Sequence, residues 1–133
     1  MPISIHEREQ EGIVILSLKG RLTVGESNPL REKIGHLLAS GRNNIVLDLE
    51  DIDYIDSTGL GSMVICYTQV ARAGGALKLT KLNRRNVELL ALTRLHTVFE
   101  VFAEELDAIN SYFPDRDIKR FDILTFIQQT EQK

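Results

Sequence analysis

The residues best suited to chemistry stand in one central stretch, "DYIDSTGLGSM", residues 53–63. Here Ser57 directly follows Asp56 and precedes two glycines, Gly59 and Gly61. A serine hydroxyl in such a setting can act as a nucleophile, accept a phosphoryl group or cap a helix. The elements that position Ser57 decide which of these uses is open to it.

The pattern predicts a strand before Ser57 and a helix after it. The apolar run 44–50 is typical of a short strand covered on both faces, and a short acidic loop should follow it. Apolar spacing predicts a helix over about 58–73, with Ser57 and Thr58 at its start. The N–H groups of residues 57–60 would lack intrahelical acceptors, so this helix start suits an anion such as phosphate.

Plainer explanations of the same residues stay open. Asp56 or Ser57 could simply be an N-cap worth ~1 kcal/mol. Each glycine costs up to ~1 kcal/mol relative to alanine, so something must offset Gly59 and Gly61. We expect them to let another molecule's backbone approach closely.

An acidic cluster lies in and around the predicted loop. Its members are Glu50, Asp51, Asp53 and Asp56. Several carboxylates can bind a divalent cation, but their spacing does not match a calcium loop. We therefore expect a solvated acidic rim with neither a metal nor a cofactor.

The rest of the chain alternates strands and helices. A hairpin is predicted from residues 3–9 and the run that begins at Ile13. A helix should follow, with Asn28 as its cap, Pro29 at its first position and Gly41 at its end. That helix buries one apolar face, formed by Leu30, Ile34, Leu37 and Leu38. Further segments are predicted as a strand at 76–82, a helix at 87–93, a strand at 97–102 and a helix at 103–113.

This alternation predicts the α/β class. We expect a mixed, mainly parallel sheet of about five strands that starts with an antiparallel hairpin, with about four main helices on it. Residues 1–113 should form this single domain, and residues 114–133 a C-terminal extension. Ile118, Phe121, Leu124 and Phe126 could form an extra helix packed on the domain or on a second copy, so a monomer and a weak homodimer both stay open.

Composition narrows the function classes. The chain has 133 residues, a net charge of −3 and a single cysteine. These values disfavour nucleic acid as a partner and exclude an intramolecular disulfide, and no apolar run approaches the ~20 residues of a membrane span. We expect a cytoplasmic protein. Cys66 should be a small buried hydrophobe, and the three histidines (His6, His36 and His96) lack metal-ligand spacing.

The segment "DSTGLG", residues 56–61, preceded by "IVLDLEDIDYI", resembles the signature of the STAS domain, the family of bacterial anti-sigma factor antagonists. The order of elements is similar from about residue 3 to 113. Two positions differ from the family pattern. Thr23 stands where an acid is common, and Arg94 stands near an expected helix-ending glycine.

The resemblance implies a switch protein without catalysis of its own. Ser57 would be phosphorylated by a partner anti-sigma factor, a serine kinase, and a PP2C-type phosphatase would reverse this. The unphosphorylated protein would bind the anti-sigma factor and free the sigma factor. Asp56 would be the neighbour of Ser57 at the docking surface, while Thr58, Gly59, Leu60 and Gly61 would shape the helix start that the partner contacts. Any exposed Met63 or Tyr67 would add contacts.

Two rival functions remain. A hydrolase would use Ser57 as a nucleophile, but its motif is Gly-x-Ser-x-Gly, whereas here Asp56 precedes Ser57 and Thr58 follows it. The second rival is a STAS module that is not phosphorylated and serves a lipid-transport or stress-signalling complex. The fold hosts such roles as well, so fold alone does not decide.

Overall fold

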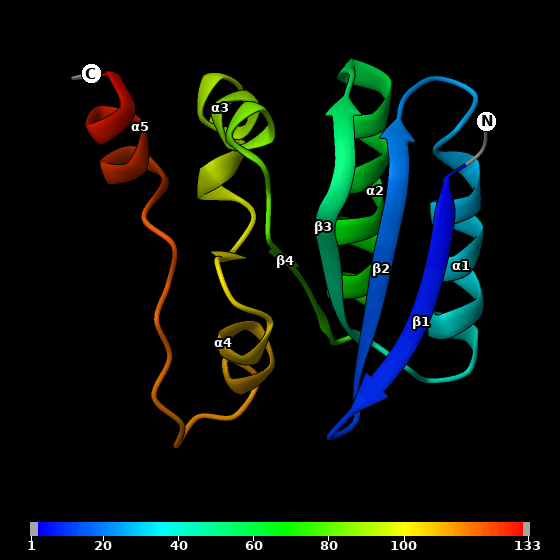
Figure 1. Ribbon diagram of the computed structural model, residues 1–133. Helices are drawn as coiled ribbons and strands as arrows, with labels where there is room; N and C mark the ends of the chain where they lie inside the picture. Colours follow the sequence, from blue (N-terminus) through cyan, green and yellow to red (C-terminus); the bar gives the residue numbers. More distant parts are fainter. Residues whose placement is uncertain (1–2, 132–133) are drawn as a thin grey trace.

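The computed structural model describes residues 3–131 and contains a five-stranded sheet (Figure 1). The strands lie in sequence order: β1 (Ser4–Gln10), β2 (Ile13–Leu22), β3 (Asn44–Ile55), β4 (Ala76–Thr80) and β5 (Val101–Phe102). β1 pairs antiparallel with β2, and all later neighbours pair in parallel. The prediction of an α/β mixed sheet that starts with a hairpin is confirmed.

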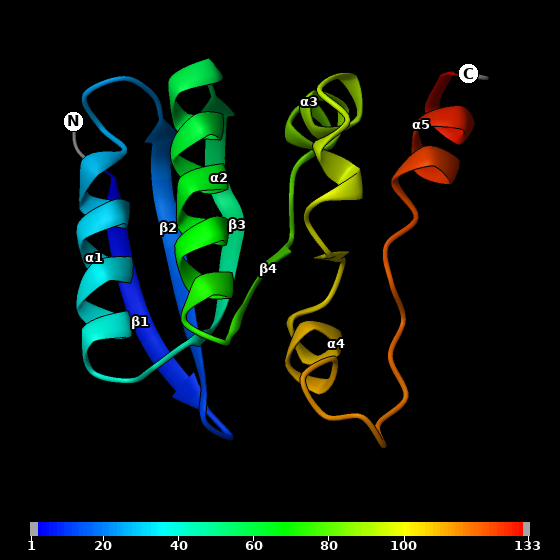
Figure 2. The same ribbon diagram turned by 180° about the vertical axis from the view of Figure 1, so that it is seen from behind.

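Helices cover the two faces of the sheet unequally. α1 (Asn28–Ala39) and α2 (Ser57–Arg72) lie side by side on one face, as Figure 2 shows, and α3 (Arg84–Leu92) adds Val87 and Leu90 to the same core. α4 (Glu105–Asn110) packs on the opposite face with its own smaller cluster. The larger core therefore lies beneath α2, the helix that carries Ser57.

β3 is longer than predicted. The expected acidic loop after Glu50 is wrong, because the strand continues to Ile55. The pairing of β3 with β2 shifts register at two places. At the first, three residues of β3 (Asp48 to Asp51) lie opposite two of β2 (Ser17 to Lys19), and the second shift lies between Gly20 and Arg21 of β2. Such bulges move the inward-facing positions along the chain, and Leu49, Ile52 and Ile55 are all buried at a spacing of three.

Other predicted boundaries also differ. The helix expected over 103–113 contains only Glu105–Asn110, and the one expected over 87–93 already begins at Arg84. The strand expected over 97–102 contains only Val101–Phe102, because Leu95–Thr97 forms a 3-10 turn that returns the chain from α3. Ser27, rather than Asn28, is the cap residue of α1. Its hydroxyl makes no capping bond and instead accepts a hydrogen bond from Ser62 of α2 at 3.0 Å.

Arg94 has a left-handed backbone conformation, with φ of 61°. It directly follows Thr93, the C-cap of α3. Glycine adopts this conformation without steric cost, which is why helices commonly end on glycine. The position at which the family pattern led us to expect glycine is thus one where the backbone favours it.

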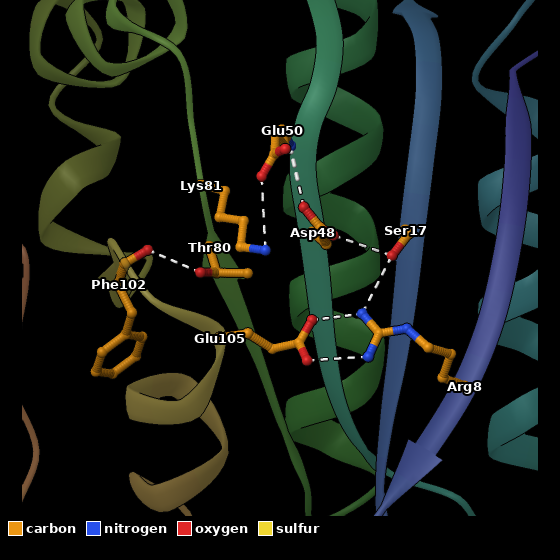
Figure 3. Close-up of polar contacts among 8 residues, drawn as sticks. All are labelled: Arg8, Ser17, Asp48, Glu50, Thr80, Lys81, Phe102 and Glu105. Atoms are coloured by element: carbon orange, nitrogen blue, oxygen red, sulfur yellow. Dashed lines mark hydrogen bonds and ion pairs between the residues drawn. The ribbon is translucent and has the colours of Figure 1, made fainter.

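A polar network holds α4 against the sheet (Figure 3). Both terminal nitrogens of the Arg8 guanidinium in β1 donate to the carboxylate of Glu105, the first residue of α4. Ser17 lies next to this pair and donates to Asp48 Oδ2 at 3.0 Å. The network crosses from β1 to β3 and joins segments far apart in the sequence.

The C-terminal segment turns back onto the domain and ends in α5 (Ile123–Glu131). The N–H of Phe121 donates to the carbonyl of Val101 at 3.2 Å, and the rings of Phe121 and Phe126 lie 5.3 Å apart. Ile123 is buried in the larger core. α5 lies beside α3 in both views, so it packs on its own domain (Figures 1 and 2).

The Arg8–Glu105 pair predicts a pH-dependent stability. Hydrogen bonding to Arg8 holds the pKa of Glu105 below its ordinary value. Glu105 should therefore stabilise the fold above the ordinary glutamate range, about pH 4.3, and this contribution should be lost as the pH falls through the lowered pKa. Glu105→Gln should cost about 1 kcal/mol of unfolding free energy at neutral pH.

Denaturant unfolding at several pH values checks this. The gap between wild type and Glu105→Gln should shrink as the solution becomes acidic, because wild type loses the charge that the variant lacks. Glu104→Gln is the matched control, since Glu104 is exposed and its side chain makes no capping bond. A gap that stays constant down to strong acid would show that the ion pair is not responsible.

Candidate functional site

Ser57 is the first residue of α2 and follows the carboxyl end of β3. Its side chain and that of Thr58 are both exposed. The Ser57 hydroxyl has no hydrogen-bond partner within residues 3–131. This end of the sheet, at the top of Figure 1, also carries the loop that connects β2 to α1. The hydroxyl is therefore accessible, and no described contact depends on it.

Asp56 is the N-cap of α2. Its Oδ1 accepts a hydrogen bond from the N–H of Gly59 at 2.8 Å, and its backbone carbonyl accepts one from Leu60 at 2.9 Å. Two of the N–H groups that we expected to be free for an anion are thus occupied within the chain. The cap explanation of Asp56 is confirmed, and its carboxylate also offsets the positive end of the helix dipole.

Asp56 also ties α2 to the neighbouring strand and loop. Its backbone N–H donates to the carbonyl of Leu22, the last residue of β2, at 3.1 Å. Its Oδ2 accepts from the N–H of Val24 at 3.2 Å. One residue therefore sets the position of the loop after β2 relative to the start of α2, and it holds Val24, which is 71% exposed, next to its own carboxylate.

The two glycines of the motif serve different purposes. A Cβ on Gly59 would lie 1.9 Å from the Leu22 carbonyl oxygen, so the backbone that approaches Gly59 belongs to this chain and not to a partner. Our expectation of a partner's backbone at Gly59 is therefore wrong. Gly61 is exposed, and a Cβ there would meet nothing within 4 Å. Only Gly61 leaves space on the outer surface.

The other motif residues divide between surface and core. Leu60 is buried, with 6% exposure, and Met63 is fully buried, so neither side chain offers a partner contact. Tyr67 is half-buried and packs edge-on against Phe99 with ring centroids 5.3 Å apart. Cys66 is buried as predicted, and burial raises the pKa of its thiol to about 11, which keeps it protonated and unreactive.

The acidic residues are spread along β3 rather than gathered in a loop. Glu50, Asp51 and Asp53 are exposed, and Glu50 lies 3.5 Å from the Lys81 ammonium. Glu50 stands roughly 16 Å along the strand from Ile55, so it lies well away from Ser57. Among residues 3–131, no three or more His, Cys, Asp or Glu side chains are placed to hold a metal ion.

A hollow of about 310 Å³ lies beside Ser57, between the start of α2 and α3. Tyr54, Asp56 and Ser57 line it from one side, and Arg85, Glu88 and Leu92 are among the residues on the other. The Arg85 guanidinium stacks over the Tyr54 ring, 4.5 Å from its centroid. Sequence reasoning missed the α3 residues, because no motif marks them and only the fold brings them to Ser57.

The model of the STAS domain family matches residues 4–108. The chain belongs to this family. It is 32% identical over 104 residues to the anti-sigma-B factor antagonist of Bacillus subtilis, covering 78% of this chain and 94% of that protein.

Two solved structures share the fold. An anti-sigma factor antagonist from Mycobacterium paratuberculosis has a TM-score of 0.73 and 20% identity, and the match covers 82% of this chain and 92% of that one. The Bacillus cell fate determinant SpoIIAA in its phosphorylated form has a TM-score of 0.64 and 19% identity, covering 82% and 99%. Within residues 3–131, no helix has the length and apolar character needed to cross a bilayer.

The glycine assignments predict opposite effects of one substitution. Gly59→Ala should lower the unfolding free energy by more than about 2 kcal/mol, because the added methyl group forces the helix start away from the Leu22 carbonyl. Gly61→Ala should be neutral or stabilise by up to about 1 kcal/mol, since alanine is the better helix former and meets open space. Denaturant unfolding compares the two. Equal effects would refute the assignment of Gly59 to internal packing.

Proposed function

We propose that this protein is an anti-sigma factor antagonist controlled by phosphorylation of Ser57. The unphosphorylated form binds an anti-sigma factor that is itself a serine kinase, and so releases the sigma factor. Phosphorylation by that kinase ends binding, and a PP2C-type phosphatase restores it. The observation that carries this proposal is the exposed, unbonded hydroxyl of Ser57 in a member of a family whose relatives are named anti-sigma factor antagonists.

The position of Ser57 suits a switch that changes binding without changing the fold. The contacts that fix the start of α2 come from Asp56 and Gly59, and none from the Ser57 side chain. A phosphate brings about −1.5 to −2 charges, and here it would stand on an exposed side chain at the hollow that Arg85 also lines. The scaffold around it has no described contact to lose.

Binding is far more sensitive to that charge. A partner that packs closely on Ser57 must remove water from the phosphate, and the Asp56 carboxylate next to it offers no compensation. A penalty of about 3 to 4 kcal/mol lowers affinity by several hundredfold. This is sufficient to release a partner of ordinary affinity.

One relative supports a phosphorylated state. SpoIIAA, a structural neighbour of this chain, has been solved in phosphorylated and unphosphorylated forms, with a TM-score of 0.64 in both comparisons. Both structures share the fold of this chain. We propose by extension that the chain acts in the cytoplasm by binding and performs no catalysis of its own.

Substitutions at Ser57 test the switch. Ser57→Asp should fold as wild type does and bind the anti-sigma factor at least about a hundredfold more weakly, because it places a permanent charge at the docking surface. Ser57→Ala should bind as wild type does and resist release by ATP. Calorimetric titration against purified anti-sigma factors from the same genome measures both affinities. Equal affinity of the two variants would contradict the proposal.

Intact mass after incubation with the bound anti-sigma factor and ATP tests the acceptor itself. Wild type should gain the mass of one phosphate, and Ser57→Ala should gain none. Thr58→Ala is the matched control, because Thr58 is the adjacent exposed hydroxyl, and it should be phosphorylated normally. Binding without any phosphate transfer would instead favour a STAS module that is not phosphorylated.

A further inference from the structure

An apolar hollow of about 330 Å³ lies between α3 and α5, and Leu92 of α3 and Leu124 of α5 are among its lining residues. Leu92 is 84% exposed and Leu124 is 55% exposed. Exposed leucines on two adjacent helices form an apolar surface of the kind that marks interaction sites. We call Leu92, Leu124 and the hollow between them the α3–α5 surface.

The α3–α5 surface is continuous with the hollow beside Ser57. Glu88 and Leu92 line both hollows, so these two residues form their common rim. The turn of α3 that contains Glu88 and Leu92 therefore borders both the Ser57 hollow and the hollow at α5. A protein that reaches into the Ser57 hollow therefore meets Leu92 at the edge of its footprint.

α5 is held in place by the domain. Ile123 is buried in the main core, and the segment before it bonds to β5 through Phe121. At the start of α5, Asp122 accepts hydrogen bonds from the N–H and the hydroxyl of Thr125, at 3.1 and 2.7 Å. The surface is therefore preorganised, which lowers the entropy cost of docking.

α5 also lies outside the part of the chain that the family model matches, residues 4–108. The family domain alone would supply Leu92 but neither Leu124 nor the hollow beside it. The extension therefore adds apolar area next to the Ser57 hollow that the shared domain does not itself provide. Added area at the edge of a common interface is a means of discriminating between related partners.

We propose that α5 extends the docking surface for the anti-sigma factor that covers Ser57, with Leu92 and Leu124 as contacts that favour this protein's own partner. This rests on the function proposed above. A second copy of the chain is the less suitable occupant, because it would cover Leu92 and Glu88, the rim of the Ser57 hollow, and so obstruct a kinase.

Single substitutions on the full chain test this. The probe is the purified anti-sigma factor that binds wild type in the titration above. Leu92→Asp and Leu124→Asp should each weaken its binding at least about tenfold, because each places a charge in an apolar contact. Leu106→Asp is the matched control. Leu106 is 59% exposed on α4. This helix lies at the lower end of Figure 1, whereas α3, α5 and the start of α2 lie at the upper end, so the substitution should leave affinity unchanged.

Circular dichroism and thermal unfolding establish that each variant is folded, as the exposure of all three leucines leads us to expect. Wild-type affinity of Leu92→Asp and Leu124→Asp, together with loss of binding in Ser57→Asp, would overturn the role of α5 while the phosphorylation switch stands.

Light scattering tests the other possible occupant of the α3–α5 surface, a second copy of the chain. A wild-type dimer that Leu124→Asp converts to a monomer, with affinity for the anti-sigma factor unchanged, would also overturn it. Failure of wild type to bind any anti-sigma factor would overturn both proposals.

Discussion

The close packing of the start of α2 on the end of β2 is the constraint on which the site depends. The Leu22 carbonyl accepts the N–H of Asp56 and leaves room only for a glycine at position 59. Asp56 then uses its two carboxylate oxygens on Gly59 and Val24. With these groups fixed, the next side chain along the helix, Ser57, must point away from the sheet. The exposure of Ser57 is thus a consequence of a buried contact a few ångströms away.

This arrangement separates the residues that hold the scaffold from those that face solvent within six consecutive residues. Asp56, Gly59 and Leu60 belong to the scaffold, whereas Ser57, Thr58 and Gly61 face outward. Helical spacing accounts for the division, since residues three or four apart share a face. A charge added to the outward set meets water, while the inward set continues to hold α2 to β2. In the proposed switch, a modification at this point would therefore change binding with little effect on the free energy of unfolding.

Most of the fold could be predicted from the sequence, because the alternation of apolar strands and amphipathic helices is regular outside two regions. β3 was predicted too short, since two bulges place Leu49, Ile52 and Ile55 three residues apart and break the period of two that identifies a strand. β5 was predicted too long, because the apolar run 97–102 begins at the end of a 3-10 turn and only its last two residues pair with β4. Within the site, the motif located Ser57. The sequence gives no sign of Leu22, whose backbone oxygen requires Gly59, or of Arg85 and Leu92, which only the fold brings to the same hollow.

Backbone amide NMR of the chain before and after phosphorylation of Ser57 tests the central claim most directly. Amide shifts should change at the start of α2, in the loop that contains Val24 and along the facing side of α3, while the contacts between Gly59 and Leu22 persist. Shifts spread across the whole sheet, or loss of the Gly59–Leu22 contacts, would show that the phosphate acts by disturbing the scaffold and would contradict this account.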